Sequence, residues 1–411
     1  MDTVSVTKEK IWGMNFFLLF LSRFAKVLAD NITLVALLWL VVELGGDAKI
    51  SSIISVCMIV PQTLLGPFLS PLLQKGKLKN WMFVSDFLRG FVILVIPVLL
   101  FLDLLSFWIL FILVLLQSTT GAIYNPASVA LLPKILGKTV LQKANATLQS
   151  SYEVITLIGL ACAGPLISLL STKVTLLITS ILFLLSGIII FGIKLIEKQQ
   201  VQKAEVKSTK YFEKVKQGFS IVKQHKLLLG LSIFALFLNI GLAPWTTLLS
   251  LFSANELNGD ATTVTLIRAS AAFGALVMGL VLTKLDITRQ GALFIGAGIL
   301  QGLMLTLIGS FPLLWLVIGA AFIFGICTTA INVPEIVIIQ TTVPEDQQAQ
   351  IYAVIMTISV AFLPIGYLLA GLFADIFGNS VIIAFGGVAI IISGILVKLF
   401  TPLFSMRIEK K

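Results

Sequence analysis

Long apolar runs, each ended by Gly, Pro or charged residues, follow one another along the whole chain. About 20 apolar residues in a helix span the hydrocarbon core of a bilayer, so each run predicts one membrane-spanning helix. The first run, about thirty residues, is too long for the core of a cleaved signal peptide, and we expect it to remain in the mature protein. We predict twelve spanning helices, at residues 12–43, 49–73, 80–101, 106–132, 141–170, 173–196, 227–254, 260–284, 289–309, 312–341, 349–375 and 378–402.

One polar interval divides these helices into two sets of six. We therefore predict an N-terminal six-helix bundle at residues 1–196, a basic loop at 197–226 and a C-terminal six-helix bundle at 227–411. The halves echo each other weakly, because Asn and Pro recur together in the fourth and tenth predicted helices. Such internal symmetry is typical of transporters built from two repeats.

Composition agrees with an all-α membrane protein. Of 411 residues, 58% are hydrophobic and only 12% are charged, whereas soluble proteins carry about 25% charged residues. Twelve spans leave almost no chain for a soluble catalytic domain. The three cysteines and the single histidine show no metal-ligand or catalytic spacing, and there is no phosphate-binding Gly-x-x-x-x-Gly-Lys-Ser/Thr loop. We therefore expect neither an enzyme nor a bound cofactor or metal.

The distribution of basic residues predicts the orientation. Of the 29 Lys and Arg residues, 23 fall on the side of the N-terminus, two (Lys49 and Lys173) fall on the other side, and four lie within helices. Because cytoplasmic segments carry the excess of Lys and Arg, both termini and the central loop should be cytoplasmic. The net charge of +10 is then a signal of membrane topology and not of nucleic-acid binding. We expect a multi-pass protein of the cell membrane.

Ionisable residues within the predicted spans are the candidate functional groups, because each costs about 2.5–3.5 kcal/mol on insertion. We take the acids as candidate proton-coupling groups and the bases as candidate substrate-binding groups. The alternative is that they are structural and form ion pairs across the bundle. The acids are Asp30, Glu153 and Glu335, and the bases are Arg23, Lys26 and Arg268.

Arg23, Lys26 and Asp30 share one face of the first helix at helical spacing. Lys26 and Asp30 are an i, i+4 pair and can neutralise each other. One hypothesis is that protonation of Asp30 frees Lys26 to hold an anionic group of a substrate. The alternative is an internal salt bridge that only holds the first helix in its bundle.

Short motifs along the chain, together with buried charge on helices 1, 5, 8 and 10 and the division into two sets of six, resemble the major facilitator superfamily. The resemblance covers essentially the whole chain. Within that superfamily the chain is similar to the branch of macrolide-efflux proteins and siderophore exporters, and the same helix 1 and helix 5 motifs also resemble lysophospholipid transporters. The motifs are Ala29-Asp30-Asn31, Leu37-Leu38-Trp39-Leu40, Gly66-Pro67, Ser85-Asp86 with Arg89, Tyr124-Asn125-Pro126-Ala127, Lys143-Ala144-Asn145, Gly164-Pro165, and Gln340 with Pro344-Glu345-Asp346.

The resemblance implies further site residues. Asn31 and Asn125 would bind substrate, whereas gating would fall to Gly66, Gly164 and Pro165. In the family, an Asp after the second helix latches the cytoplasmic side, but Gln74 stands at that place here. Ala349-Gln350 likewise replaces the Gly-Arg expected in the second half. We assign the remaining cytoplasmic gate to Lys75, Lys79, Asp86 and Arg89, although the positive-inside rule explains the lysines equally well.

The resemblance implies a proton-coupled secondary exporter that works by alternating access. Its substrate would be a small amphiphilic or anionic compound, such as a macrolide or a siderophore. The alternative is a translocator of lysophospholipid or another lipid, with the same fold. Protons, a small-molecule substrate and the bilayer are the expected partners, and we expect a monomer.

Overall fold

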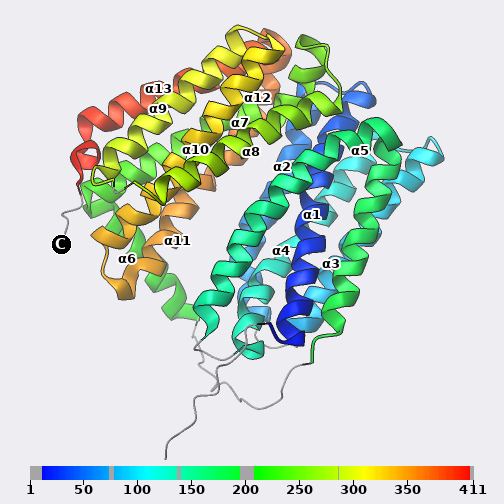
Figure 1. Cartoon of the computed structure of the whole chain (residues 1–411), viewed down its shortest axis with the longest axis horizontal. Coiled ribbons are helices and arrows are strands. Elements are labelled where there is room, and N and C mark those ends of the chain that lie inside the picture. The colour runs from blue at the N-terminus through cyan, green and yellow to red at the C-terminus, as the bar shows by residue number, and fades with distance from the viewer. Residues whose placement is uncertain (1–11, 74–77, 137–139, 195–207, 286, 408–411) are drawn as a thin grey trace, which may run out of the picture. The chain divides into compact units, whose positions relative to one another are not determined.

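The structure, a computed structural model, describes residues 12–73, 78–136, 140–194, 208–285 and 287–407. Within these ranges the regular elements are all helical, which confirms the predicted all-α class (Figure 1). The helices are α1 (Met14–Glu43), α2 (Ala48–Leu73), α3 (Leu78–Phe101), α4 (Phe107–Ile135), α5 (Leu141–Phe191), α6 (Ser208–Gln224), α7 (Lys226–Glu256), α8 (Ala261–Leu282), α9 (Gln290–Ser310), α10 (Leu314–Thr342), α11 (Glu345–Ala361), α12 (Leu363–Phe377), α13 (Asn379–Phe400) and the 3-10 helix η2 (Pro402–Ser405).

Ten helical stretches of the described residues are long and apolar enough to cross a membrane. One of them covers 143–191 and is interrupted at Ser171, whose φ of 76° lies outside the helical range. This interruption lies between the two predicted helices at 141–170 and 173–196. The shorter apolar helix Ala48–Thr63 lies in α2. The exact number of twelve spans stays a prediction.

The predicted span at 349–375 corresponds to one stretch that is long and apolar enough to cross a membrane, Gln350–Phe377, but this stretch consists of two helices. They meet at Phe362, which ends α11 and precedes α12. Pro364 lies in the first turn of α12, where its missing N–H leaves no hydrogen bond unmade. The missing N–H also means that α11 cannot continue through Pro364 with an unbroken series of hydrogen bonds.

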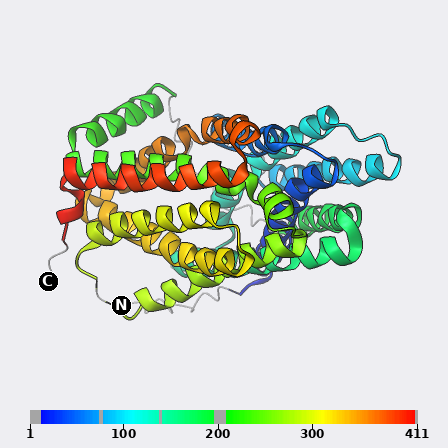
Figure 2. The ribbon, with the colours of Figure 1, turned by 90° about the horizontal axis from the view of Figure 1, so that it is seen from above.

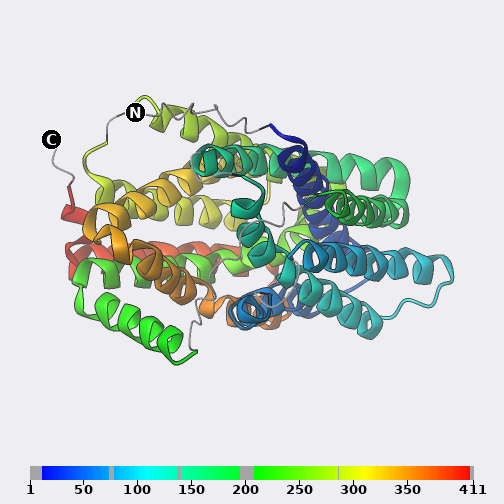
Figure 3. The ribbon, with the colours of Figure 1, turned by 90° about the horizontal axis from the view of Figure 1, so that it is seen from below.

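A helix lies inside the predicted central loop. The sequence interpretation treats 197–226 only as a polar interval, whereas α6 forms over Ser208–Gln224. The helix packs against α11 and α7 (Figure 3). Gly218 permits the close approach, because a Cβ there would lie 2.8 Å from Cγ2 of Val354.

The chain divides into two compact units. The first contains residues 1–37 and 57–199, and the second contains 38–56 and 200–411. In the first unit α3 packs on α4 and α5. Its core includes Phe16, Leu19, Met82, Tyr124 and Leu131.

In the second unit α13 packs beside α7 and α9 (Figure 2), and α10 packs beside α8 and α9. Glycines bring these helices into backbone contact, which is typical of membrane helices. A Cβ at Gly325 of α10 would lie 1.7 Å from the carbonyl oxygen of Ala271 on α8. A Cβ at Gly274 of α8 would lie 2.0 Å from the carbonyl oxygen of Phe322.

Candidate functional site

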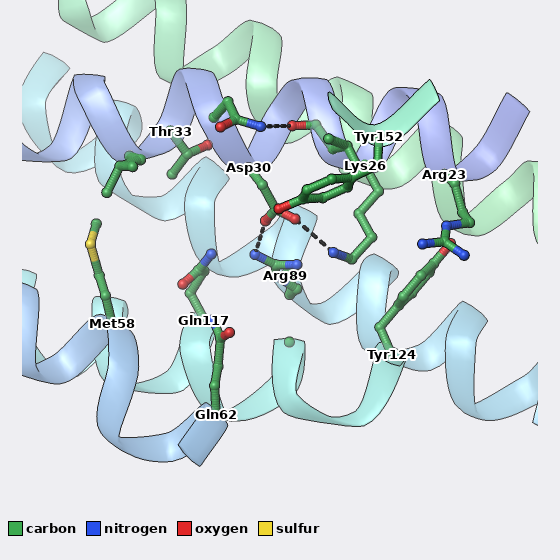
Figure 4. A pocket seen from close by; sticks show the side chains of 14 residues that line it. Arg23, Lys26, Asp30, Thr33, Met58, Gln62, Arg89, Gln117, Tyr124 and Tyr152 are labelled. Carbon is green, nitrogen blue, oxygen red and sulfur yellow. Dashed lines mark hydrogen bonds and ion pairs between the residues drawn. The ribbon is translucent and has the colours of Figure 1, made fainter. Parts of the chain in front are cut away.

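A group of charged side chains lies inside the first unit, on the faces of α1 and α3. Lys26 and Asp30 are one helical turn apart on α1, and Lys26 Nζ lies 2.6 Å from Asp30 Oδ2. The other carboxylate oxygen, Oδ1, accepts a hydrogen bond from Arg89 Nη2 on α3. Asp30 therefore holds a different cation with each oxygen (Figure 4). We call Asp30, Lys26 and Arg89 the Asp30 clamp.

Aromatic rings and a glycine hold the two cations of the Asp30 clamp in place. Lys26 Nζ lies 4.7 Å from the centre of the Tyr124 ring, and Arg89 Cζ lies 4.3 Å from the centre of the Phe183 ring. Gly121 on α4 leaves room for Arg89, because a Cβ there would lie 3.1 Å from Arg89 Cζ. Helices α4 and α5 thus position cations that belong to α1 and α3.

The Asp30 clamp forms part of the wall of a cavity of about 280 Å³. Arg23 lies on the same wall, one turn before Lys26, and no ion pair involves it among the described residues. Figure 4 shows its guanidinium beside the hydroxyl of Tyr124. The lining residues therefore include three cations but one carboxylate. The lining residues are Arg23, Lys26, Val27, Asp30, Asn31, Thr33, Leu34, Met58, Gln62, Arg89, Gln117, Gly121, Tyr124 and Tyr152.

Asp86 lies behind this cavity and does not line it. Its side chain is fully buried, and Oδ2 accepts a hydrogen bond of 2.5 Å from the hydroxyl of Ser186 on α5. The proposed gate at Asp86 and Arg89 thus corresponds to one residue in the cavity wall and one in the interior of the unit. Lys79, also assigned to the gate, donates hydrogen bonds of 3.0 and 2.9 Å to the carbonyls of Phe191 and Ile193.

The other predicted binding residues lie apart from the Asp30 clamp or make structural contacts. Asn31 lines the cavity and donates a 2.8 Å hydrogen bond to the carbonyl of Val27. Arg268 lies in the second unit, and its Nη2 is 3.4 Å from the carbonyl of Thr246. Glu335, also in the second unit, is 7% exposed, and its Oε1 has no hydrogen-bond partner among the described residues.

The structural alternative, in which a buried acid and a buried base pair across the bundle, is not met by Glu335 with Arg268 within the described part of the chain. Gly164 is buried and Pro165 is exposed within α5. The predictions for Gln74 and Lys75 lie outside the described residues, as do the surroundings of Gly66 and the side chains of Asn125 and Glu153. Within the described ranges, no group of three His, Cys, Asp or Glu side chains could hold a metal ion.

Several cavity residues escape the sequence interpretation. Gln62 and Gln117 interrupt apolar runs, which is a signal that could have drawn attention to them. Tyr152 carries no such signal, whereas Tyr124 appears in the sequence only as part of the motif Tyr124-Asn125-Pro126-Ala127. Arg89 appears in the sequence as a gate residue, since nothing in its neighbourhood along the chain identifies Asp30 as its partner.

The sequence model described as Major Facilitator Superfamily matches residues 19–362. The chain belongs to this superfamily. It is therefore a multi-pass membrane transporter. A relative in Bacillus subtilis, an uncharacterized MFS-type transporter named YvqJ, is 37% identical over 97% of this chain and 95% of its own. Macrolide efflux protein A of Streptococcus pyogenes is 22% identical over 90% of this chain and 92% of its own.

Solved structures of other transporters share this major facilitator fold. A bacterial homologue of the iron transporter ferroportin, in an inward-facing state, aligns with a TM-score of 0.72 at 15% identity. The alignment covers 94% of this transporter and 98% of that chain. The nucleoside transporter NupG aligns with a TM-score of 0.72 at 14% identity, over 94% of this chain and 100% of that one. At these identities the likeness establishes the fold alone.

Proposed function

We propose that this transporter exports a small amphiphilic compound from the cell in exchange for protons. The observation that carries the proposal is the Asp30 clamp, a carboxylate held between two cations in the wall of a cavity. The side chain of Asp30 is 31% exposed, so both a proton and a substrate can reach it from the cavity. The macrolide efflux relatives support the outward direction.

Exchange requires that the proton-bound and substrate-bound forms exclude each other. With Asp30 ionised, Lys26 and Arg89 each pair with one of its oxygens, and the amides, tyrosines and apolar residues of the cavity are available to an amphiphile. Protonation of Asp30 removes the compensating charge and leaves two unpaired cations in the wall. An apolar or cationic group would then have to displace the water around those cations, or be repelled by them. The protonated cavity therefore rejects such a substrate.

The sign of this coupling bears on the class of substrate. An anionic group would bind better to the protonated cavity, because Lys26 and Arg89 would then be free to pair with it. Proton and anion would move together, and the inward proton gradient would drive import. We therefore assign to export a substrate without net negative charge, in preference to an anionic siderophore.

The energy available agrees with export against a concentration gradient. A proton that moves inward contributes about 2.3 kcal/mol per 100 mV of membrane potential. Since a factor of ten in concentration corresponds to about 1.4 kcal/mol, one proton per cycle at 100 mV supports a gradient above tenfold for a substrate without net charge.

The direction of proton movement tests the proposal. Liposomes that contain the purified chain and a trapped pH indicator receive a labelled macrolide from outside. We expect the macrolide to enter and the internal pH to rise faster than in protein-free liposomes, because protons leave as the substrate enters. A fall in internal pH would indicate cotransport and contradict the proposal. Movement of labelled lysophospholipid, with no macrolide-dependent proton movement, would instead favour a lipid translocator.

Glu335 is a second candidate for proton binding. A buried carboxylate without a counter-charge is costly when ionised, and Glu335 has no ion pair among the described residues. We expect Glu335→Gln to raise the thermal unfolding temperature of the purified protein, by about 2–4 °C per kcal/mol of burial cost removed. The gain should be larger at pH 9 than at pH 5, because only the ionised carboxylate carries this cost. A lower unfolding temperature of Glu335→Gln at both pH values would contradict the idea that the ionised carboxylate destabilises the folded protein.

A further inference from the structure

Asp86 is a fully buried acidic residue that takes no part in the ion pairs of the Asp30 clamp. Lys26 and Arg89 are the cations near it, and the structure binds both of them to Asp30. The other oxygen of Asp86, Oδ1, has no hydrogen-bond partner among the described residues. The polar contact made by this carboxyl is the hydroxyl of Ser186.

A chain of hydroxyl groups leads from Asp86 to the cavity. Ser186 Oγ lies 3.0 Å from Ser22 Oγ on α1, and Ser22 Oγ lies 3.3 Å from the hydroxyl of Tyr124 on α4. Tyr124 lines the cavity, where its hydroxyl lies beside Arg23 (Figure 4). Four helices thus contribute one residue each to a continuous path of hydrogen bonds, from the cavity wall to the buried carboxyl.

The number of protons in this chain distinguishes two states. Ser186 Oγ lies within hydrogen-bond distance of Asp86 Oδ2, Ser22 Oγ and the carbonyl oxygen of Ser22, the last at 3.1 Å. A hydroxyl has one proton and can donate only one of these bonds. If Asp86 is ionised, Ser186 donates to it, and Tyr124, Ser22 and Ser186 can all point toward the carboxylate.

If Asp86 carries a proton, the same contacts are used in another way. Asp86 then donates to Ser186, and Ser186 is free to donate to the carbonyl of Ser22. Each short contact of Ser186 is satisfied in this form. The network therefore accommodates both forms of Asp86, through rotation of hydroxyl groups and without movement of a helix.

We propose that Asp86 is a second proton-binding carboxyl of the first unit, reached from the cavity through Tyr124, Ser22 and Ser186. Proton uptake there removes a negative charge behind Lys26 and Arg89, so it changes how tightly these cations hold Asp30. The role in transport rests on the proposed proton exchange, whereas proton binding by Asp86 can be measured separately. The charged and titratable groups that face this carboxyl are Lys26 and Asp30 on α1, Arg89 on α3 and Tyr124 on α4.

Infrared spectroscopy of the purified full chain during a pH titration tests the proposal, because a protonated carboxyl has its own C=O stretching band. We expect Asp86→Asn to remove one titrating component of this band, and Asp30→Asn to retain that component at a different midpoint, because the two carboxyls share Lys26 and Arg89 as neighbours. If all titrating components persist in Asp86→Asn, the proposal is overturned. The measurement requires no transported substrate. It therefore tests proton binding by Asp86 independently of the proposed export.

Ser186→Ala provides a second test, which does not require that the Asp86 variant folds. Loss of the hydroxyl removes a hydrogen bond that is stronger to the ionised form. We expect the midpoint of the Asp86 component to move upward by about one pH unit. Ser180→Ala is the matched control, because Ser180 is also fully buried on α5 and its hydroxyl has no partner among the described residues. Equal midpoints in the two serine variants would contradict the proposal.

Discussion

We expect Asp30→Asn to abolish macrolide-dependent proton movement in liposomes. Asparagine keeps the size of the side chain but can neither bind the transported proton nor neutralise Lys26 and Arg89. The variant is therefore held in the equivalent of the protonated form, in which two unpaired cations exclude the substrate. The measurement is the rate of internal pH change after addition of the labelled macrolide, which should fall to that of protein-free liposomes. Exchange at the unaltered rate would contradict the role of the Asp30 clamp.

The same substitution also affects stability, and a control must separate the two effects. Removal of one partner of a buried ion pair costs about 3–5 kcal/mol, because the remaining charge is left uncompensated. Arg89 is only 3% exposed, so this cost applies to it. The double variant Asp30→Asn/Arg89→Gln removes one of the two charges that lose their partner, while Lys26 remains. We expect it to regain part of the thermal stability, but not proton exchange.

Asp103→Asn is the matched control for the same chemical change outside the site. Asp103 lies in the loop between α3 and α4 with a φ of 55°, a conformation that Asn tolerates well. We expect this variant to retain both the unfolding temperature and the rate of proton movement. Loss of exchange in both Asp variants would indicate that the effect on transport is not specific to the Asp30 clamp.

We expect Gly325→Val, in the second unit, to reduce the stability of the folded protein strongly. The Cβ would lie 1.7 Å from the carbonyl oxygen of Ala271. Because the obstacle is backbone, no rotation of a side chain can relieve the overlap, and α8 and α10 must separate. Overpacking typically costs about 1–3 kcal/mol, and an overlap with backbone lies toward the upper end of this range. We expect a lower unfolding temperature and a smaller yield of monodisperse protein in detergent, measured by size-exclusion chromatography.

Gly319→Val on the same helix provides the comparison. Gly319 is exposed, and a Cβ there would meet no atom within 4 Å. Both variants place the same β-branched residue in α10, so the intrinsic cost to the helix is equal. Equal unfolding temperatures for the two variants would show that α8 and α10 do not approach each other as closely as the structure indicates.

Local pattern was sufficient to predict much of the fold and one contact of the site. Helical spacing placed Arg23, Lys26 and Asp30 on one face, and the predicted contact of Lys26 with Asp30 is confirmed. The break in α5 at Ser171 lies where the two predicted helices meet. The helix α6 was not predicted, because its many polar residues were interpreted as a loop although its apolar residues recur at helical spacing.

The contacts between helices could not be predicted in this way. Arg89 is 59 residues from Asp30 along the chain, and the charge of Arg89 is equally consistent with a gate residue. Glu335 and Arg268 could be expected to pair as opposite charges of the second half, yet they do not do so among the described residues. Spacing along one helix carries no information about which face of another helix meets it.

By itself, the sequence determined that this protein spans the membrane repeatedly and which ionisable residues its apolar helices carry. Both properties follow from the cost of placing polar groups in hydrocarbon, which acts on each segment separately. Only the tertiary structure decided that Arg89 neutralises Asp30, that Asp86 lies behind them on a chain of hydroxyls, and that Glu335 has no ion pair among the described residues. These properties depend on the packing of helices distant in sequence, where a few ångströms decide whether charges meet.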